Sequence, residues 1–225
     1  DVCSSDLQYF FGGFSHSWIN PIAFTLVISY LLGFSFFEID VLFLDYVNIK
    51  EPISQLIAEG KIEVLAFDIK TIDFFNTFFF SYIGSEATPG YLSYMWDSAF
   101  AIPAFRFGFL TLLASIILFS FDLVSYYAPI AFIASYGFFV AIFAQTAQFG
   151  IFGQGDLVFA FFSSGVLFSA FFLLDWPGTS PLNPLGKTIY GLFAGTLAFV
   201  IIGSGQSTIG LMFTILLVNI LSPLM

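Results

Sequence analysis

Long apolar runs constrain this chain more than any other feature of its sequence. The stretch FGFLTLLASIILFSF, residues 107–121, would be apolar on every face of a helix, whereas the strands of a membrane barrel alternate apolar and polar residues. Only 9% of the residues are charged, against about 25% in an ordinary soluble domain, and 59% are hydrophobic. The sequence therefore predicts an all-α membrane protein folded as a polytopic helical bundle.

Six segments approach the roughly 17 to 25 apolar residues that a membrane-spanning helix needs. Between the first and second lies a long stretch, residues 38–102, whose charge and broken hydrophobicity suit an extramembrane segment of short strands or amphipathic turns. The remaining connections are short. The predicted spans are residues 18–37, 103–121, 126–145, 157–175, 188–204 and 207–224.

The charge and the metal-binding residues exclude several functions. The net charge is −10, and ten of the fifteen acids fall between Glu38 and Asp97, so nucleic acid is not an expected partner. The single cysteine, Cys3, and the single histidine, His16, cannot supply the roughly four ligands of a zinc site or an iron–sulfur cluster. We predict no metal site, and any redox chemistry must use an organic cofactor.

The first seven residues, DVCSSDL, match the translation of a common sequencing-adapter end, and we expect them to be non-native. This interpretation divides the chain into four parts. Residues 1–7 are the adapter remnant, residues 8–37 hold the first span and its preceding loop, residues 38–102 are extramembrane, and residues 103–225 form a five-helix membrane bundle.

An Asn-Pro pair occurs twice before an apolar run. Residues 17–21 and 180–184 share the pattern S-x-x-N-P. Two readings stay open, because corresponding broken helices mark the repeats of many transporters, while Asn-Pro is also a common way to start a helix. The glycines in the later spans are expected to mark helix contacts rather than cofactor loops; they are Gly165, Gly191, Gly195 and Gly203.

Three collinear segments carry a more specific pattern. They are FFGGFSHSWINPIAFTLVISY (10–30), GSEATPGY (84–91), and the stretch from SSGVLFSAFFLLDWPGTSPLNPLGKTIYG to LLVNILSPLM (163–225). Together they resemble the RnfD/NqrB family, membrane subunits of the Rnf complex and of the sodium-translocating NADH:quinone oxidoreductase, with RnfD the closer match. The resemblance covers the later part of a fold of about ten helices in two inverted repeats, so we expect this chain to be an N-terminally truncated fragment.

The resemblance implies a function that the residues alone do not. The chain looks like a membrane subunit of an ion-translocating electron transport complex, which couples electron transfer to sodium or proton transport and catalyses nothing alone. Its implied partners are the other subunits of an Rnf/Nqr-type complex, a flavin transferase and membrane lipid. Its implied location is the bacterial inner (plasma) membrane, crossed several times.

The second segment is similar to the family's flavin-attachment site. The resemblance implies that the hydroxyl of Thr88 carries FMN through a phosphoester bond, with Ser85 and Ala87 matching the motif around it. A noncovalent flavin such as riboflavin is a further option that the family resemblance leaves open. We expect Pro89 and Gly90 to form a turn that presents Thr88.

Two departures from the motif keep other functions open. Tyr82 stands where the family has an acidic residue, and Glu86 stands where it has Gly or Gln. An unflavinylated scaffold subunit is therefore one alternative. A small-solute channel or transporter of similar repeat architecture is another, because a fold does not fix a function.

Asp175 ends a predicted span and is our candidate for an ion path, because an acid close to the membrane is by default functional. The alternative is an interfacial acid in a solvated loop.

Overall fold

Helices dominate the part of the chain that the computed structural model describes, and no strand occurs within it. The described residues are 19–33, 64–80, 89–90, 92–93, 103–143, 157–203 and 209–224.

The order of the helices follows the predicted spans closely. The extramembrane stretch contributes a helix that the sequence pattern did not predict, α4, which continues into a π-helical turn, η3. Two further π-helical turns, η5 and η6, extend α10 and α11, and a 3₁₀ turn, η7, follows α12. The bounds are α2 Pro21–Leu32, α4 Ala66–Phe75, η3 Asn76–Phe80, α7 Pro103–Ser120, α8 Tyr127–Ile142, α9 Leu157–Ser163, α10 Val166–Phe168, η5 Ser169–Leu173, α11 Pro184–Ala198, η6 Phe199–Gly203, α12 Gly210–Leu221 and η7 Ser222–Leu224.

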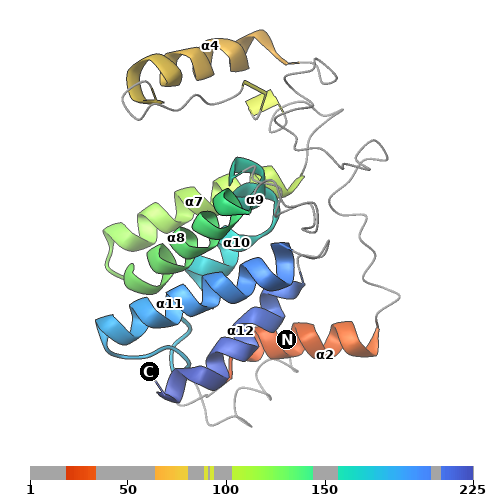
Figure 1. The fold of residues 1–225 in the computed structure, drawn as a ribbon, viewed down its shortest axis with the longest axis vertical. Coiled ribbons are helices and arrows are strands. Elements are labelled where there is room, and N and C mark those ends of the chain that lie inside the picture. The colour runs from red at the N-terminus through yellow and green to blue at the C-terminus, as the bar shows by residue number, and fades with distance from the viewer. Residues whose placement is uncertain are drawn as a thin grey trace.

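Helices α7 to α12 form a bundle, with α4 set apart from it (Figure 1). The most extensive contact is between α8 and α11. Helix α12 packs against both α11 and α2, and α7 packs against α9. The core between these helices is formed by buried apolar side chains, among them Phe132, Phe159, Leu174 and Ile202.

Glycines make the α8–α11 contact close. A Cβ atom at Gly191 would overlap the carbonyl oxygen of Ala128, and one at Gly195 would overlap both Phe132 O and Ser135 Oγ. The two backbones therefore approach as they do at the small-residue interfaces of membrane helices. The prediction that Gly191 and Gly195 mark helix contacts is confirmed.

Both Asn-Pro pairs begin helices. The side chain of Asn20 accepts hydrogen bonds from the backbone N–H groups of Ile22 and Ala23, and that of Asn183 accepts one from Leu185. A proline follows each asparagine in the first turn, where its missing N–H is not needed. This confirms the helix-start reading, and the repeat reading stays a prediction.

The apolar helices fall short of six full spans. Among the described residues, the 20-residue stretch Pro184–Gly203 is the one helix both long and apolar enough to cross a membrane. The shorter apolar helices are Pro21–Leu32, Phe107–Ser120, Tyr127–Ile142 and Gly210–Leu221. The all-helical architecture of the described residues agrees with the predicted fold class, while the six-span membrane topology stays a prediction.

The predicted span 157–175 is interrupted. Helix α9 ends at Ser163, Gly165 adopts a left-handed backbone with φ of +78°, and α10 begins at Val166. Glycine reaches this conformation without the steric penalty that other residues meet. Gly165 therefore marks a helix break, and it also faces α12, because a Cβ atom there would lie 3.5 Å from the side chain of Leu211.

Candidate functional site

The residues of the flavin-attachment motif lie mainly outside the described residues. Thr88, Ser85 and Ala87 are among those not described, so their predicted role is not tested by the structure. The turn that follows them is present at Pro89 and Gly90, and Gly90 has a φ of +133°, a conformation that favours glycine. The predicted turn directly after Thr88 is confirmed.

A buried acid joins α4 to the chain just beyond this turn. The carboxylate of Asp68, which is completely buried, accepts hydrogen bonds from the backbone N–H of Ser93 at 2.7 Å and from its hydroxyl at 2.8 Å. The Ser93 hydroxyl in turn accepts one from the backbone N–H of Leu65 at 2.9 Å. The start of α4 is thereby tied to a residue five positions after Thr88. Sequence reasoning missed this contact, because the partners are 25 residues apart.

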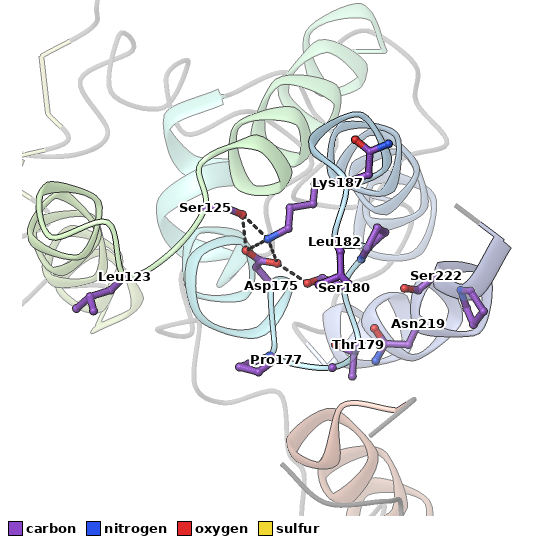
Figure 2. Close-up of a pocket in the computed structure, with 14 residues that line it drawn as sticks. Leu123, Ser125, Asp175, Pro177, Thr179, Ser180, Leu182, Lys187, Asn219 and Ser222 are labelled. Atoms are coloured by element: carbon purple, nitrogen blue, oxygen red, sulfur yellow. Dashed lines mark hydrogen bonds and ion pairs between the residues drawn. The ribbon is translucent and has the colours of Figure 1, made fainter. Parts of the chain in front are cut away.

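Asp175 lies at one end of the bundle in a compact polar cluster (Figure 2). Lys187 Nζ is 2.9 Å from one carboxylate oxygen of Asp175 and 2.8 Å from the other. The hydroxyls of Ser125 and Ser180 each donate to the same carboxylate at 2.5 Å, and Lys187 also donates to Ser125 at 2.7 Å. Three separate segments of the chain thus meet at one carboxylate, which we call the Asp175 cluster.

This carboxylate is well buried and fully paired. The Asp175 side chain is 7% exposed and that of Lys187 is 17% exposed. Burial by itself raises the pKa of Asp175, but the hydrogen bonds from Lys187, Ser125 and Ser180, with the charge of Lys187, outweigh it and hold the pKa below its ordinary value. Asp175 is therefore ionised and paired, rather than an acid in a solvated loop.

A pocket of about 890 Å³ opens beside the Asp175 cluster. Its walls include the loop after Asp175, the start of α11 at Asn183, and Asn219 and Ser222 from the end of the last helix (Figure 2). The lining offers hydroxyl and amide groups, and its one acid and one base neutralise each other. Such a wall suits an uncharged ligand with several hydrogen-bonding groups.

A second buried network holds the wall of this pocket in place. The Tyr190 hydroxyl and the Asn219 amide are hydrogen-bonded at 2.7 Å. With the amide oriented to satisfy all its neighbours, the Asn219 oxygen accepts from the backbone N–H of Asn20 at 2.9 Å and its nitrogen also donates to the Ile215 carbonyl. The Asn20 side chain donates to the Leu173 carbonyl at 2.9 Å. This Tyr190–Asn219 network links α2, η5, α11 and α12.

Sequence reasoning identified one member of this end of the bundle, Asp175, and missed its partners. Lys187 and Ser180 follow Asp175 within one short loop and helix start, which was the available signal for a pair. Ser125 lies 50 residues from Asp175 along the chain, so the sequence carried no signal that the two are in contact. Among the described residues no group of three or more His, Cys, Asp or Glu side chains could hold a metal ion.

Comparison with known proteins finds one matching family and several similar proteins. The profile of the NQR2, RnfD, RnfE family matches residues 7–225. The D subunit of an ion-translocating oxidoreductase complex from Actinobacillus succinogenes is 35% identical over 99 residues, which are 43% of this chain and 26% of that protein. The D subunit of a proton-translocating ferredoxin:NAD(+) oxidoreductase complex from Clostridium ljungdahlii is 33% identical over 101 residues, 45% of this chain and 30% of that protein.

A third relative, the D subunit of an ion-translocating oxidoreductase complex from Colwellia psychrerythraea, is 38% identical over 71 residues, 32% of this chain and 20% of that protein. The alignments with these three relatives therefore span between about a fifth and a third of each relative's length.

Proposed function

Because the chain belongs to the NQR2, RnfD, RnfE family, we propose that it is a membrane subunit of an ion-translocating electron transport complex. The observation that carries this proposal is the family match, which extends over residues 7–225 rather than over one motif. The names of the relatives agree, since each is the D subunit of a complex that moves ions or protons. The partners we propose are the other subunits of such a complex and the lipid of the bacterial inner membrane.

The membrane-embedded part is the helical bundle. We propose six spans that belong to the later part of a ten-helix fold with two inverted repeats. The apolar helices support this, as do large hydrophobic side chains exposed on their outer faces, such as Phe107, Ile117, Ile130 and Phe138. Lipid, or further helices of the complex, would cover such faces.

We propose that Thr88 carries FMN. A transferase would move the group from FAD: the Thr88 hydroxyl oxygen forms a bond to the phosphorus of the FMN half, the pyrophosphate bond of FAD breaks, and AMP leaves with the hydroxyl proton. The bound flavin would supply one- and two-electron redox chemistry. The turn at Pro89–Gly90 and the Asp68–Ser93 hydrogen bonds support the proposal, because they anchor the chain just after the hydroxyl that the transferase must reach.

Asp175 stays our candidate for the ion path. Its carboxylate is neutralised by Lys187, so a cation that visits it must displace the ammonium group first. The uncharged hydrogen-bonding pocket beside it could hold a noncovalent flavin such as riboflavin. In either role, the side chains at this end of the bundle would hold the bound ion or flavin in position.

The test is covalent flavin on the complete subunit, co-expressed with a flavin transferase. Intact mass and in-gel flavin fluorescence are compared for the wild type, Thr88→Ala and Thr88→Ser. We expect a mass gain of one FMN in the wild type and none in Thr88→Ala, with the hydroxyl of Thr88→Ser retaining partial modification. Absence of flavin from the wild type would refute attachment and favour the unflavinylated scaffold that Tyr82 and Glu86 keep open.

A further inference from the structure

Helix α4 and the π-helical turn η3 that continues it carry three phenylalanine side chains that are mostly exposed. Phe67, Phe74 and Phe78 are 68%, 55% and 59% exposed. The ring centroids of Phe74 and Phe78 are 4.7 Å apart, so these two rings lie against each other. Residues seven and four positions apart lie on one face of a helix. We call these three side chains the α4 stripe.

The exposed charges of this helix lie on another side. Asp73 directly precedes Phe74, which places it about 100° around the helix from that ring. Lys70 and Asp73 are both exposed and have opposite signs, so together they offer little net charge to a charged partner. The third charged residue, Asp68, is buried and hydrogen-bonded to Ser93. Contact with the α4 stripe would therefore depend on apolar burial rather than on charge.

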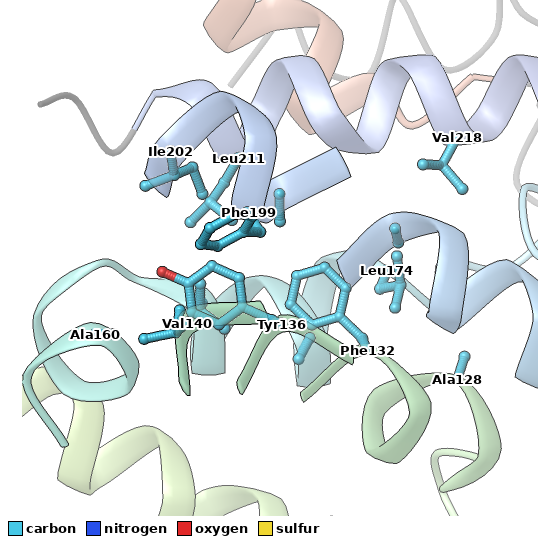
Figure 3. Close-up of a cluster of buried hydrophobic side chains, with 14 of the residues drawn as sticks. Ala128, Phe132, Tyr136, Val140, Ala160, Leu174, Phe199, Ile202, Leu211 and Val218 are labelled. Carbon is cyan, nitrogen blue, oxygen red and sulfur yellow. The ribbon is translucent and has the colours of Figure 1, made fainter. Parts of the chain in front are cut away.

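The start of α4 reaches the bundle. Val64, two residues before the helix, packs against the buried apolar core of the bundle, part of which Figure 3 shows. The bundle helices expose large apolar side chains of their own, among them Ile117 and Ile130 at 58% and 56%. The proposed function places those outer faces in lipid. A helix that starts next to this bundle and exposes phenylalanines is within reach of the same bilayer.

The α4 stripe needs an apolar cover, which another subunit or the bilayer can supply. Phenylalanines gathered on one face are typical of helices that lie in the membrane interface, with that face buried about 5–10 Å deep. A protein partner would in addition be expected to find a polar rim, and here the exposed charges beside the stripe are the opposed pair Lys70 and Asp73. We propose that α4 and η3 lie along the bilayer surface with the α4 stripe inserted among the lipid chains. This proposal rests on the proposed function, which puts the bundle in a membrane.

The placement of α4 bears on the flavin motif. Asp68 on α4 accepts hydrogen bonds from the backbone N–H and the hydroxyl of Ser93, at 2.7 and 2.8 Å. The five residues that lead from Thr88 to Ser93 span at most about 18 Å even when fully extended. A flavin on Thr88 would thereby be tethered to a helix at the membrane surface.

The lipid contact is tested by photocrosslinking of the complete subunit within its complex, reconstituted in phosphatidylcholine vesicles. Benzoylphenylalanine, which inserts into neighbouring C–H bonds when illuminated, replaces Phe67, Phe74 or Asp73 in separate variants. It replaces Ile117 in a fourth variant, as the reference for a lipid-facing position on the bundle. Mass spectrometry then identifies what is attached to each position. We expect lipid adducts at Phe67 and Phe74 to be several-fold more frequent than at Asp73.

Adducts of Phe67 and Phe74 with another subunit in place of lipid would overturn the proposal, and so would the absence of any adduct at both positions. Lipid adducts at Asp73 as frequent as at Phe74 would overturn the assignment of the stripe as the buried face. The reference separates these results from a failure of the proposed function. No lipid adduct at Ile117 would refute the membrane-embedded bundle, whereas lipid at Ile117 and none at Phe67 and Phe74 would overturn the α4 proposal alone.

Discussion

The two buried polar regions of this bundle differ in how completely their groups are paired. In the Asp175 cluster, every charge faces its opposite and both serine hydroxyls donate to the carboxylate. At the break between α9 and α10, the hydroxyls of Tyr136 and Ser169 have no partner among the described residues. Paired groups stabilise a fold and unpaired buried groups destabilise it unless a ligand completes them. The charges of the Asp175 cluster therefore satisfy each other, whereas the break leaves buried hydroxyls without a partner among the described residues.

The largest effect is expected when the positive charge of Lys187 is removed from the Asp175 cluster. Lys187→Met should lower the free energy of unfolding by about 3 kcal/mol, because it leaves the Asp175 carboxylate buried without a counter-charge. The measurement is chemical or thermal unfolding of the subunit in detergent.

The control for Lys187→Met is the double variant Asp175→Asn with Lys187→Met, which removes both charges and should recover most of the lost stability. A Lys187→Met variant as stable as the wild type would show that the Asp175 cluster contributes nothing to the fold.

Two glycines allow a matched comparison of the regions. Gly165 at the break has a φ of +78°, and Gly178 in the loop after Asp175 has a φ of +90°. Replacement of either by Ala should destabilise the fold by about 1–2 kcal/mol, since both positions require a left-handed backbone. A Cβ at Gly165 would meet only Leu211, at an ordinary 3.5 Å.

Unfolding of the two variants in detergent, measured beside the wild type, checks this expectation. A Gly165→Ala or Gly178→Ala variant as stable as the wild type would show that the position tolerates a side chain at its positive φ.

The two buried tyrosines give a smaller contrast. Tyr190→Phe should destabilise the subunit by about 1 kcal/mol, because the Asn219 amide loses a buried partner. Tyr136→Phe should have a smaller effect, since it removes a hydroxyl that no protein group satisfies among the residues the structure describes. Unfolding midpoints of the two variants, measured side by side, check this order, and the reverse order would contradict the assignment of partners.

The smallest effect on stability near neutral pH is expected from the titration of Asp175. Its pKa in the folded state is lowered from the ordinary 3.8, so its contribution to stability is fully present above that value and is lost as the pH falls through the lowered pKa. Unfolding followed from pH 6 down to about pH 3 should show a steeper loss in the wild type than in Asp175→Asn. Identical slopes would show that Asp175 is not perturbed.

Hydropathy predicted the helices because a helix in apolar surroundings needs apolar residues along its whole length. The predicted span 103–121 corresponds to helix Pro103–Ser120, and the predicted span 126–145 contains Tyr127–Ile142. Gly191 and Gly195 were identified as helix contacts because small residues are what a close approach requires. Local signals of this kind need no knowledge of the tertiary structure.

The same reasoning failed where a distant partner decides the outcome. The Ser-Ser-Gly sequence at 163–165 is too short to remove the apolar character of its span, so hydropathy did not reveal the helix break. The partners of Asp68 and Tyr190 lie 25 and 29 residues away along the chain. In each case the three-dimensional arrangement, rather than the local sequence pattern, determines the hydrogen-bond partner.

The central claim is that this chain links electron transfer to ion movement through a flavin on Thr88. Its most direct test is electron-driven ion uptake by vesicles that contain the complete complex with either the wild-type subunit or Thr88→Ala. The account predicts that Thr88→Ala, assembled in normal amounts, loses both electron transfer and ion uptake, and that Thr88→Ser retains part of each. Full electron transfer and ion uptake in Thr88→Ala would contradict it.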